Sequence, residues 1–363
     1  MGPLRAGADI WRDRTGVDIH WEARSLRDFG DQQLDHLARS FDLLSIDHPF
    51  VGTIAETRSL SPLDEVVPAD VLDELARDSI GLSHASYTYG GVQWALATDA
   101  ACQVAALRDD LLLSDVPLTW DDVISLAQES PGRVALPLTP ADAISSYLTL
   151  LANSGSPAPA SNERFADPVA GLRALKILCT LSAYGNSEAF AMNPPTLLEH
   201  MSTTNEIIYI PLTFGYTNYS RPASTAARIR FADIPSDGSG PVGSVLGGAG
   251  LAVSAHSAHK EEAATFAAWL TGADAQRTVV VPAGGQPGSR AAWLDPDLDT
   301  LTGGFLSGTR ETIEHAYLRP REPWWPPFQL AAGELLNQEL RRRPDPDDVY
   351  RQLEHLYRTA HSE

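Results

Sequence analysis

Residues 87–113, YTYGGVQWALATDAACQVAALRDDLLL, decide how this chain is organised. An aromatic and glycine-rich turn leads into a short apolar strand that ends at the polar pair Thr98-Asp99. A second apolar strand follows directly and runs toward Arg108. Because no helix is needed between these strands, the pattern fits a chain that crosses from one lobe to another. We expect the polar residues at the crossing to face a cleft.

The length and charge of the chain limit the classes of protein to which it can belong. At 363 residues it is too long for one compact core and suits two lobes. Its formal net charge is −20 at pH 7, so nucleic acids and anionic membrane surfaces should repel it. No apolar run approaches the ~20 residues that a membrane-spanning helix needs. We expect no nucleic-acid partner, no membrane span and a monomer.

Metal and cofactor chemistry have no clear signal in the sequence. Cys102 and Cys179 form no CxxC pair, and both lie in apolar surroundings typical of small buried residues. Whether they form a disulfide stays open. The chain contains no GxSxG elbow, HExxH helix or P-loop. We expect no cofactor and no metal.

The first hundred residues alternate between strand and helix patterns. Residues 17–21 alternate as a strand does, and a helical pattern follows over 31–39. The apolar run at 41–46 is typical of a buried parallel strand, and it ends at Asp47-His48. Strand–helix–strand alternation of this kind predicts a doubly wound α/β lobe.

A second α/β lobe is predicted from roughly residue 100 to 240. Four helix starts mark it, at Thr119, Thr139, Asp167 and Asn193, the last three followed by proline. Residues 133–137 and 206–211 have strand patterns. A glycine-rich stretch at 236–250 then returns the chain to the first lobe. We therefore predict a first lobe of residues 1–98 plus 247–302, and a second lobe of 99–246 plus 303–363 with C-terminal helices.

Six short motifs carry a family resemblance through their order along the chain. They are RTGV at 14–17, DLLSID at 42–47, LDE at 63–65, PLTWDD at 117–122, GGAG at 247–250 and GGQP at 284–287. Their order resembles that of bacterial extracellular solute-binding proteins, the sugar-type (family 1) substrate-binding components of ABC importers. The resemblance implies an α/β, two-lobed, periplasmic-binding-protein-like fold of type II. It also implies hinge strands near Thr98-Asp99 and 247–250, with a ligand cleft between the lobes.

The start of the sequence departs from that family. There, a strand precedes the first helix and lies inside the first sheet, whereas this sequence opens at the helix. A missing inner strand would leave buried backbone groups unpaired, at ~1–3 kcal/mol each. Either a strand and its export signal precede Met1, or another segment fills the gap, or the chain is a cytoplasmic relative. The resemblance implies an extracytoplasmic location, although residues 1–10 contain neither a signal core nor a lipid-acceptor cysteine.

A sugar site needs flat aromatic faces together with carboxylates and amides that bind paired hydroxyls. Ligands of open α/β sheets bind at the carboxyl ends of strands. On these grounds the expected ligand-binding residues are Asp47, His48, Trp94, Asp99, Tyr216, Asn218, Tyr219, Gly248, Gln286 and Trp325. Alternatives stay open for three of them. Trp94 could be strand core, Trp325 could only pack the C-terminal tail, and Gly248 could mark a bulge or a lobe crossing.

These observations predict a protein that binds a small polar solute, a carbohydrate or polyol, and delivers it to an ABC permease. The alternative is a cytoplasmic enzyme built on the same fold, with Asp47, His48 and Asp99 as acid/base groups. A third hypothesis is a glycosidase, since two of the 47 acidic residues could meet in a cleft.

Overall fold

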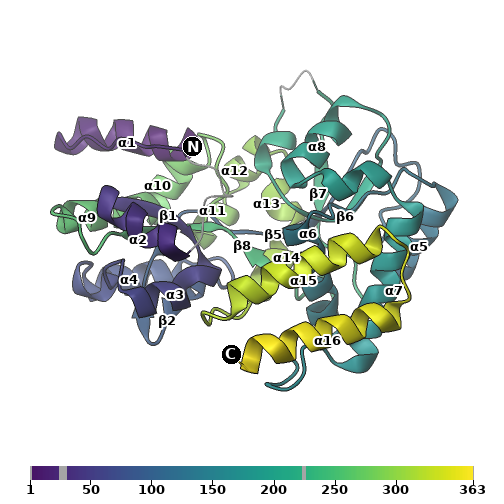
Figure 1. Cartoon of the computed structure of the whole chain (residues 1–363). Helices are drawn as coiled ribbons and strands as arrows, with labels where there is room; N and C mark the ends of the chain where they lie inside the picture. Colours follow the sequence, from purple (N-terminus) through teal and green to yellow (C-terminus); the bar gives the residue numbers. More distant parts are fainter. Residues whose placement is uncertain (1, 24–30, 223–225, 363) are drawn as a thin grey trace. The chain divides into compact units, whose positions relative to one another are not determined.

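The structure, a computed structural model, describes residues 2–23, 31–222 and 226–362 (Figure 1). The chain divides into two units, each with its own core. Unit 1 comprises Met1–Ala101, Gly247–Leu301 and Pro320–Pro323. Unit 2 comprises Cys102–Leu246, Thr302–Arg319 and Trp324–Glu363.

The sheet of unit 1 has the strand order β1-β9-β4, formed by β1 (Leu43–Asp47), β9 (Ala249–Val253) and β4 (Leu96–Ala97). Both pairings of β9 are antiparallel. The prediction that residues 41–46 form a parallel strand is therefore wrong for the described ladder. The reason is that the neighbour of β1 is the returning segment β9, which runs in the opposite direction.

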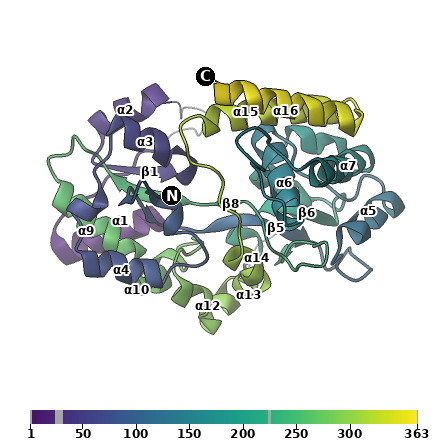
Figure 2. The same ribbon diagram turned by 90° about the horizontal axis from the view of Figure 1, so that it is seen from below.

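Helices cover both faces of this sheet. The helices of unit 1 are α1 (Gly2–Thr15), α2 (Asp31–Ser40), α3 (Val51–Thr57), α4 (Ala69–Arg77), α9 (Lys260–Thr271), α10 (Ala273–Ala275), α11 (Arg290–Trp293) and α12 (Pro296–Leu301). One apolar cluster joins α1 and α9 to β9 through Trp11, Phe266 and Leu251. A second cluster joins α2 and α3 to β1. These two helices lie on the other side of the sheet from α1 and α9, as Figure 2 shows. A separate hairpin pairs β2 (Thr88–Tyr89) with β3 (Val92–Gln93).

The sheet of unit 2 has the order β6-β5-β7, formed by β6 (Tyr209–Phe214), β5 (Ala101–Leu107) and β7 (Arg230–Ala232). A short strand, β8 (Leu246–Gly247), also pairs with β5. Its helices are α5 (Trp120–Glu129), α6 (Pro140–Asn153), α7 (Pro168–Tyr184), α8 (Pro194–Thr203), α13 (Phe305–Gly308), α14 (Arg310–Glu314), α15 (Trp325–Leu340) and α16 (Pro346–Ser362). One large apolar cluster fills unit 2. No described helix in the chain is long and apolar enough to span a bilayer.

Capping chemistry explains where the helices of unit 2 begin. Thr119 and Asp122 form the predicted capping box of α5. The side chains of Asp167 and Asn193 accept backbone N–H groups at the starts of α7 and α8. The predicted helix start after Thr139 is confirmed, because α6 begins at Pro140. The Thr139 hydroxyl does not cap the backbone, however, and bonds the Asp142 carboxylate.

Two predicted strands do not form. Residues 17–23 belong to no helix and no strand among the described residues. Residues 133–137 contribute only an isolated bridge between Val134 and Tyr209. An alternating pattern becomes a strand only where a neighbouring backbone continues the ladder. Residues 133–135 bond to Ile208 and to Tyr209, at the start of β6, but the ladder stops at that one bridge, and residues 17–23 join no ladder in the described structure.

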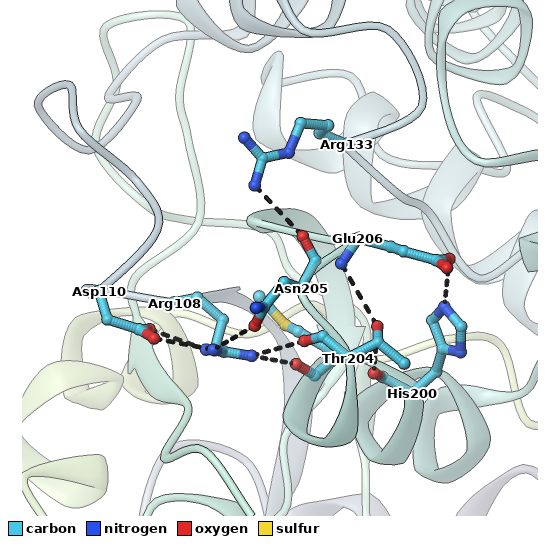
Figure 3. A network of polar contacts seen from close by, with 8 residues as sticks. Arg108, Asp110, Arg133, His200, Thr204, Asn205 and Glu206 are labelled. Carbon is cyan, nitrogen blue, oxygen red and sulfur yellow. Dashed lines mark hydrogen bonds and ion pairs between the residues drawn. The ribbon is translucent and has the colours of Figure 1, made fainter.

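A buried arginine ties the end of β5 to the end of α8 in unit 2 (Figure 3). The Arg108 side chain is only 3% exposed and donates to the carbonyl oxygens of Met201 (2.7 Å) and Thr204 (2.8 Å). It also binds the Asp110 carboxylate at 2.8 Å. Arg108 thereby satisfies carbonyl groups that the last turn of a helix leaves without partners.

We predict that Arg108→Ala lowers the free energy of unfolding by about 2–4 kcal/mol, because it leaves helix-end carbonyls buried without donors. The matched control is Arg133→Ala, which removes a single surface contact to the Asn205 carbonyl in the same network. The control should change stability by no more than about 0.5 kcal/mol. Urea denaturation measures both variants, and equal losses would contradict the role given to Arg108.

Candidate functional site

Three of the expected site residues line one pocket of unit 1, whose volume is about 900 Å³. Asp47 ends β1, Asp99 follows β4, and Gln286 lies in the loop before α11. The ends of the two strands that flank β9, together with one loop, thus bring two carboxylates and an amide to the same pocket. Such groups bind pairs of sugar hydroxyls and, equally, backbone N–H groups.

The Asp99 carboxylate has a raised pKa in this pocket. The residue keeps some exposed surface, but its carboxylate is enclosed and accepts the backbone N–H of Ala249. Burial raises the pKa of Asp99 to about 6; the nearby Asp47 adds to the rise, and the Ala249 hydrogen bond opposes it. The threonine beside it, Thr98, donates to the carbonyl oxygen of Ala249 at 2.8 Å.

Gly248 permits the close approach of β9 to Asp99. Its φ is +119°, and a Cβ placed there would lie 2.7 Å from the Asp99 carbonyl oxygen. Its own carbonyl oxygen accepts the Tyr87 hydroxyl at 3.0 Å. Gly248 is therefore required by the backbone, and the pocket lining does not include it.

The other expected residues of unit 1 lie away from the pocket lining. His48 is buried, with its ring edge-on to Tyr87 at 6.1 Å between centroids. Trp94 is buried in the cluster that packs against β1, and its indole N–H donates to the Tyr89 carbonyl. We therefore assign Trp94 to the core of unit 1 and leave it out of the binding set.

In unit 2, the segment after β6 presents polar and aromatic side chains at the surface. Tyr216 is 38% exposed, and Asn218 is exposed on a 3-10 turn over Thr217–Tyr219. Tyr219 is partly buried and donates its hydroxyl to the Pro195 carbonyl at the start of α8. Burial raises the pKa of Tyr219, and Glu199 adds to the rise. Tyr216 and Asn218 are thus the accessible members of this segment.

Trp325, unlike Tyr216 and Asn218, is not accessible to a ligand. Its side chain is fully buried at the start of α15, in contact with the rings of Phe165, Trp324 and Phe328. Its indole N–H donates to Gln329. A ring that is fully buried among other aromatic side chains cannot stack on a ligand without a change in the core of unit 2, which favours the packing alternative for Trp325.

Sequence reasoning missed a large part of the pocket lining. Residues 17–23 line the same pocket as Asp47, and they bring Trp21 and His20 to it. The alternating pattern of 17–21 was the available signal, but it predicted a strand and not a pocket wall. No group of three or more potential metal ligands occurs among the described residues.

A model described as bacterial extracellular solute-binding protein matches residues 32–300. Comparison with curated protein sequences gave no significant match.

Several solved structures resemble the chain over nearly its whole length. A ribitol complex of an ABC transporter solute-binding protein from Agrobacterium radiobacter K84 has 21% identity and a TM-score of 0.79, covering 98% of this chain and 94% of that chain. A similar protein from Thermotoga lettingae, bound with α-D-tagatose, has 18% identity and a TM-score of 0.82, covering 99% and 95%. A maltose-bound protein from T. maritima has 18% identity and a TM-score of 0.80, covering 98% and 95%. At such identities the similarity establishes the fold, and the predicted α/β fold class is confirmed.

We predict that the ionisation of Asp99 lowers the free energy of unfolding as the pH rises. Because its folded-state pKa is raised, its contribution to stability is fully present below about pH 4 and is lost as the pH rises through about 6. Asp99→Asn should reduce the difference in unfolding free energy between pH 4.5 and pH 7 by about 1–2 kcal/mol, a figure discounted for solvent at the pocket. Urea melts at several pH values test this, with surface Asp73→Asn as control. An unchanged profile in Asp99→Asn would refute it.

We also predict that Gly248→Ala destabilises the protein more than Gly238→Ala. Both glycines have positive φ, at +119° and +101°, but a Cβ at Gly238 meets nothing within 4 Å. Both variants carry backbone strain of about 1–3 kcal/mol, whereas only Gly248→Ala adds overlap with Asp99. Denaturant unfolding should therefore show an extra loss of at least about 1 kcal/mol for Gly248→Ala.

Proposed function

This chain belongs to the bacterial extracellular solute-binding protein family, and we propose that it binds a carbohydrate or polyol for uptake through an ABC permease. The family match over residues 32–300 is the observation that carries the proposal. Solved proteins of the same fold with ribitol, α-D-tagatose or maltose bound support the choice of ligand class.

The chemistry of the unit 1 pocket suits a ligand rich in hydroxyl groups. Asp47 supplies carboxylate oxygens that accept from vicinal hydroxyls, and Gln286 offers both an acceptor and donors. The Gln286 amide already donates to the Ala100 carbonyl at 3.2 Å, which holds its orientation. Asp99 is a less available acceptor, because it already accepts the N–H of Ala249.

Unit 2, taken by itself, also has accessible polar and aromatic residues of the kind that bind sugars. The ring of Tyr216 offers an apolar face of the sort that covers the C–H face of a sugar. Asn218 offers an amide beside it. We propose Asp47, Asp99 and Gln286 of unit 1, and separately Tyr216 and Asn218 of unit 2, as ligand-contacting residues.

The enzymatic alternative is less well supported. Its acid/base set needs His48 beside Asp47 and Asp99, but His48 is buried and does not line the pocket. The family to which the chain belongs is one of binding proteins. We propose an extracytoplasmic location, a membrane permease as the protein partner and a monomeric state, all of which follow from the family role.

The ligand is tested by a thermal-shift screen of polyols, ketohexoses and maltose, followed by titration calorimetry with any hit. We predict that Asp47→Asn and Tyr216→Ala each weaken binding tenfold or more, about 1.4 kcal/mol or above, through lost hydroxyl hydrogen bonds and lost ring contact.

Matched controls are Asp73→Asn and Tyr184→Ala, which change the same residue types at exposed positions elsewhere. Both controls should bind the hit as the wild type does. Unchanged affinity in both test variants would remove Asp47 and Tyr216 from the site, and absence of any sugar or polyol hit would count against the ligand class.

A further inference from the structure

A buried glutamine lies next to the pocket of unit 1 without being part of its lining. Gln276 is 0% exposed and begins a π-helix over Gln276–Val280, whose last residue lines the pocket. A primary amide has donors and an acceptor, and its burial is costly unless these groups find partners. The hydrogen bonds of Gln276 therefore explain why a polar side chain occupies this position.

The Gln276 amide joins three separate pieces of backbone. Its Nε2 donates to the carbonyl oxygens of Thr98 at 3.2 Å and Leu270 at 3.0 Å. Its Oε1 accepts the backbone N–H of Gly288 at 2.8 Å. Thr98 directly follows β4, Leu270 belongs to α9, and Gly288 lies in the loop before α11. One side chain thus links the end of β4 to the loop before α11.

Both linked segments carry proposed ligand contacts. Asp99 directly follows Thr98, and Gln286 lies two residues before Gly288. Asp99 and Gln286 both line the pocket. A side chain can reach only the space that its backbone allows, so a bond that fixes the adjacent backbone also restricts the carboxylate and the amide. Gln276 can therefore affect a ligand without touching it.

Close packing holds the loop before α11 against the same stretch of chain. A Cβ at Gly288 would lie 2.9 Å from the carbonyl oxygen of Ala97, the last residue of β4. The Gln286 amide donates to the Ala100 carbonyl at 3.2 Å. The loop therefore contacts the chain on either side of the point that the Gln276 amide holds. Because the bonds of Gln276 are buried, water does not compete for them, and they are stronger than equivalent bonds at the surface.

We propose that Gln276 is a positioning residue for the pocket of unit 1. Its buried amide holds the end of β4 and the loop before α11 in one arrangement, and so sets the places of Asp99 and Gln286. The effect on ligand affinity rests on the proposed function, whereas the effect on the two segments does not. Contact residues that are held in place before a ligand arrives lower the ordering cost of binding.

The variant Gln276→Met tests this role, because methionine keeps the length and nearly the volume of the side chain but removes its amide. The matched control is Gln93→Met. Gln93 is likewise buried, and its amide donates to the carbonyls of His84 and Ala95 and accepts the Thr88 hydroxyl. The two glutamines make bonds of the same kinds in unit 1, but those of Gln276 join segments that line the pocket.

Hydrogen exchange measures the arrangement of the segments without any ligand. The N–H groups of Thr98 and Asp99 both donate to a β9 carbonyl. Their exchange rates are normalised to residues 251–253 of β9, which corrects for any loss of global stability. In Gln276→Met the normalised rates should rise about tenfold or more, and in Gln93→Met by less than about twofold. An equal rise in both variants, or no rise in Gln276→Met, would overturn the proposal.

Titration calorimetry with ribitol, D-tagatose and maltose as probes measures the effect on binding. For a probe that binds the wild type, Gln276→Met should weaken affinity about fivefold or more, and Gln93→Met less than about twofold. Equal losses in the two variants, or no loss in Gln276→Met, would overturn the role of Gln276 in ligand binding. If no probe binds the wild type, that result counts against the proposed function, and hydrogen exchange still decides the inference.

A second variant acts on the same link from its other side and keeps the test valid if Gln276→Met does not fold. Gly288→Ala adds a methyl group against the last carbonyl of β4 while the Gln276 amide stays intact. Its control is Gly308→Ala in unit 2, whose Cβ would lie 2.7 Å from the Phe231 carbonyl oxygen. The normalised exchange of amides 98–99 should rise about tenfold in Gly288→Ala and stay unchanged in the control. No difference between these two variants would contradict the proposal.

Discussion

The pairing of β9 with two neighbours at once positions the candidate site of unit 1. Its first residue, Ala249, lies opposite Asp47 on β1, accepts the backbone N–H groups of Thr98 and Asp99, and donates to the Asp99 carboxylate. One residue of a central strand thus holds the ends of both flanking strands together. Gly248 makes this possible, because a side chain there would collide with Asp99. The carboxylates are close to one another because the ladder requires it.

That closeness has an electrostatic cost. Asp99 is enclosed beside a second carboxylate, which is why its pKa is raised to about 6. Asp142 in unit 2 shows that burial alone produces the same effect, since burial raises its pKa to about 6 even though the Thr139 hydroxyl, which bonds the carboxylate, opposes the rise. The difference between the two lies in their surroundings. Asp99 lines a pocket that a ligand can enter, whereas Asp142 is enclosed at the start of α6. Perturbed acids at accessible positions are the ones with functional promise.

Burial also distinguishes the aromatic residues that a ligand could contact from those that only pack the core. Trp94 and Trp325 have the surfaces that sugar sites use, but each is packed within the core of its own unit. Tyr216 and Trp21 keep accessible surface. A residue type can be read from a sequence, but its exposure depends on which neighbours cover it. The proposed binding set therefore retains the tyrosine and drops both tryptophans.

Short-range sequence patterns were enough to predict the α/β class and the direct succession of β4 and β5. They also predicted the helix starts at Thr119, Asp167 and Asn193. Capping and alternation act over a few residues, so they need no knowledge of distant contacts. Strand partners, by contrast, were decided only by tertiary structure. Residues 17–21 have the pattern of a strand but join no ladder in the described structure. β1 pairs with a segment that lies about 200 residues further along the chain and runs antiparallel to it. A ladder needs two backbones, and which two backbones meet is settled by packing and not by either sequence alone.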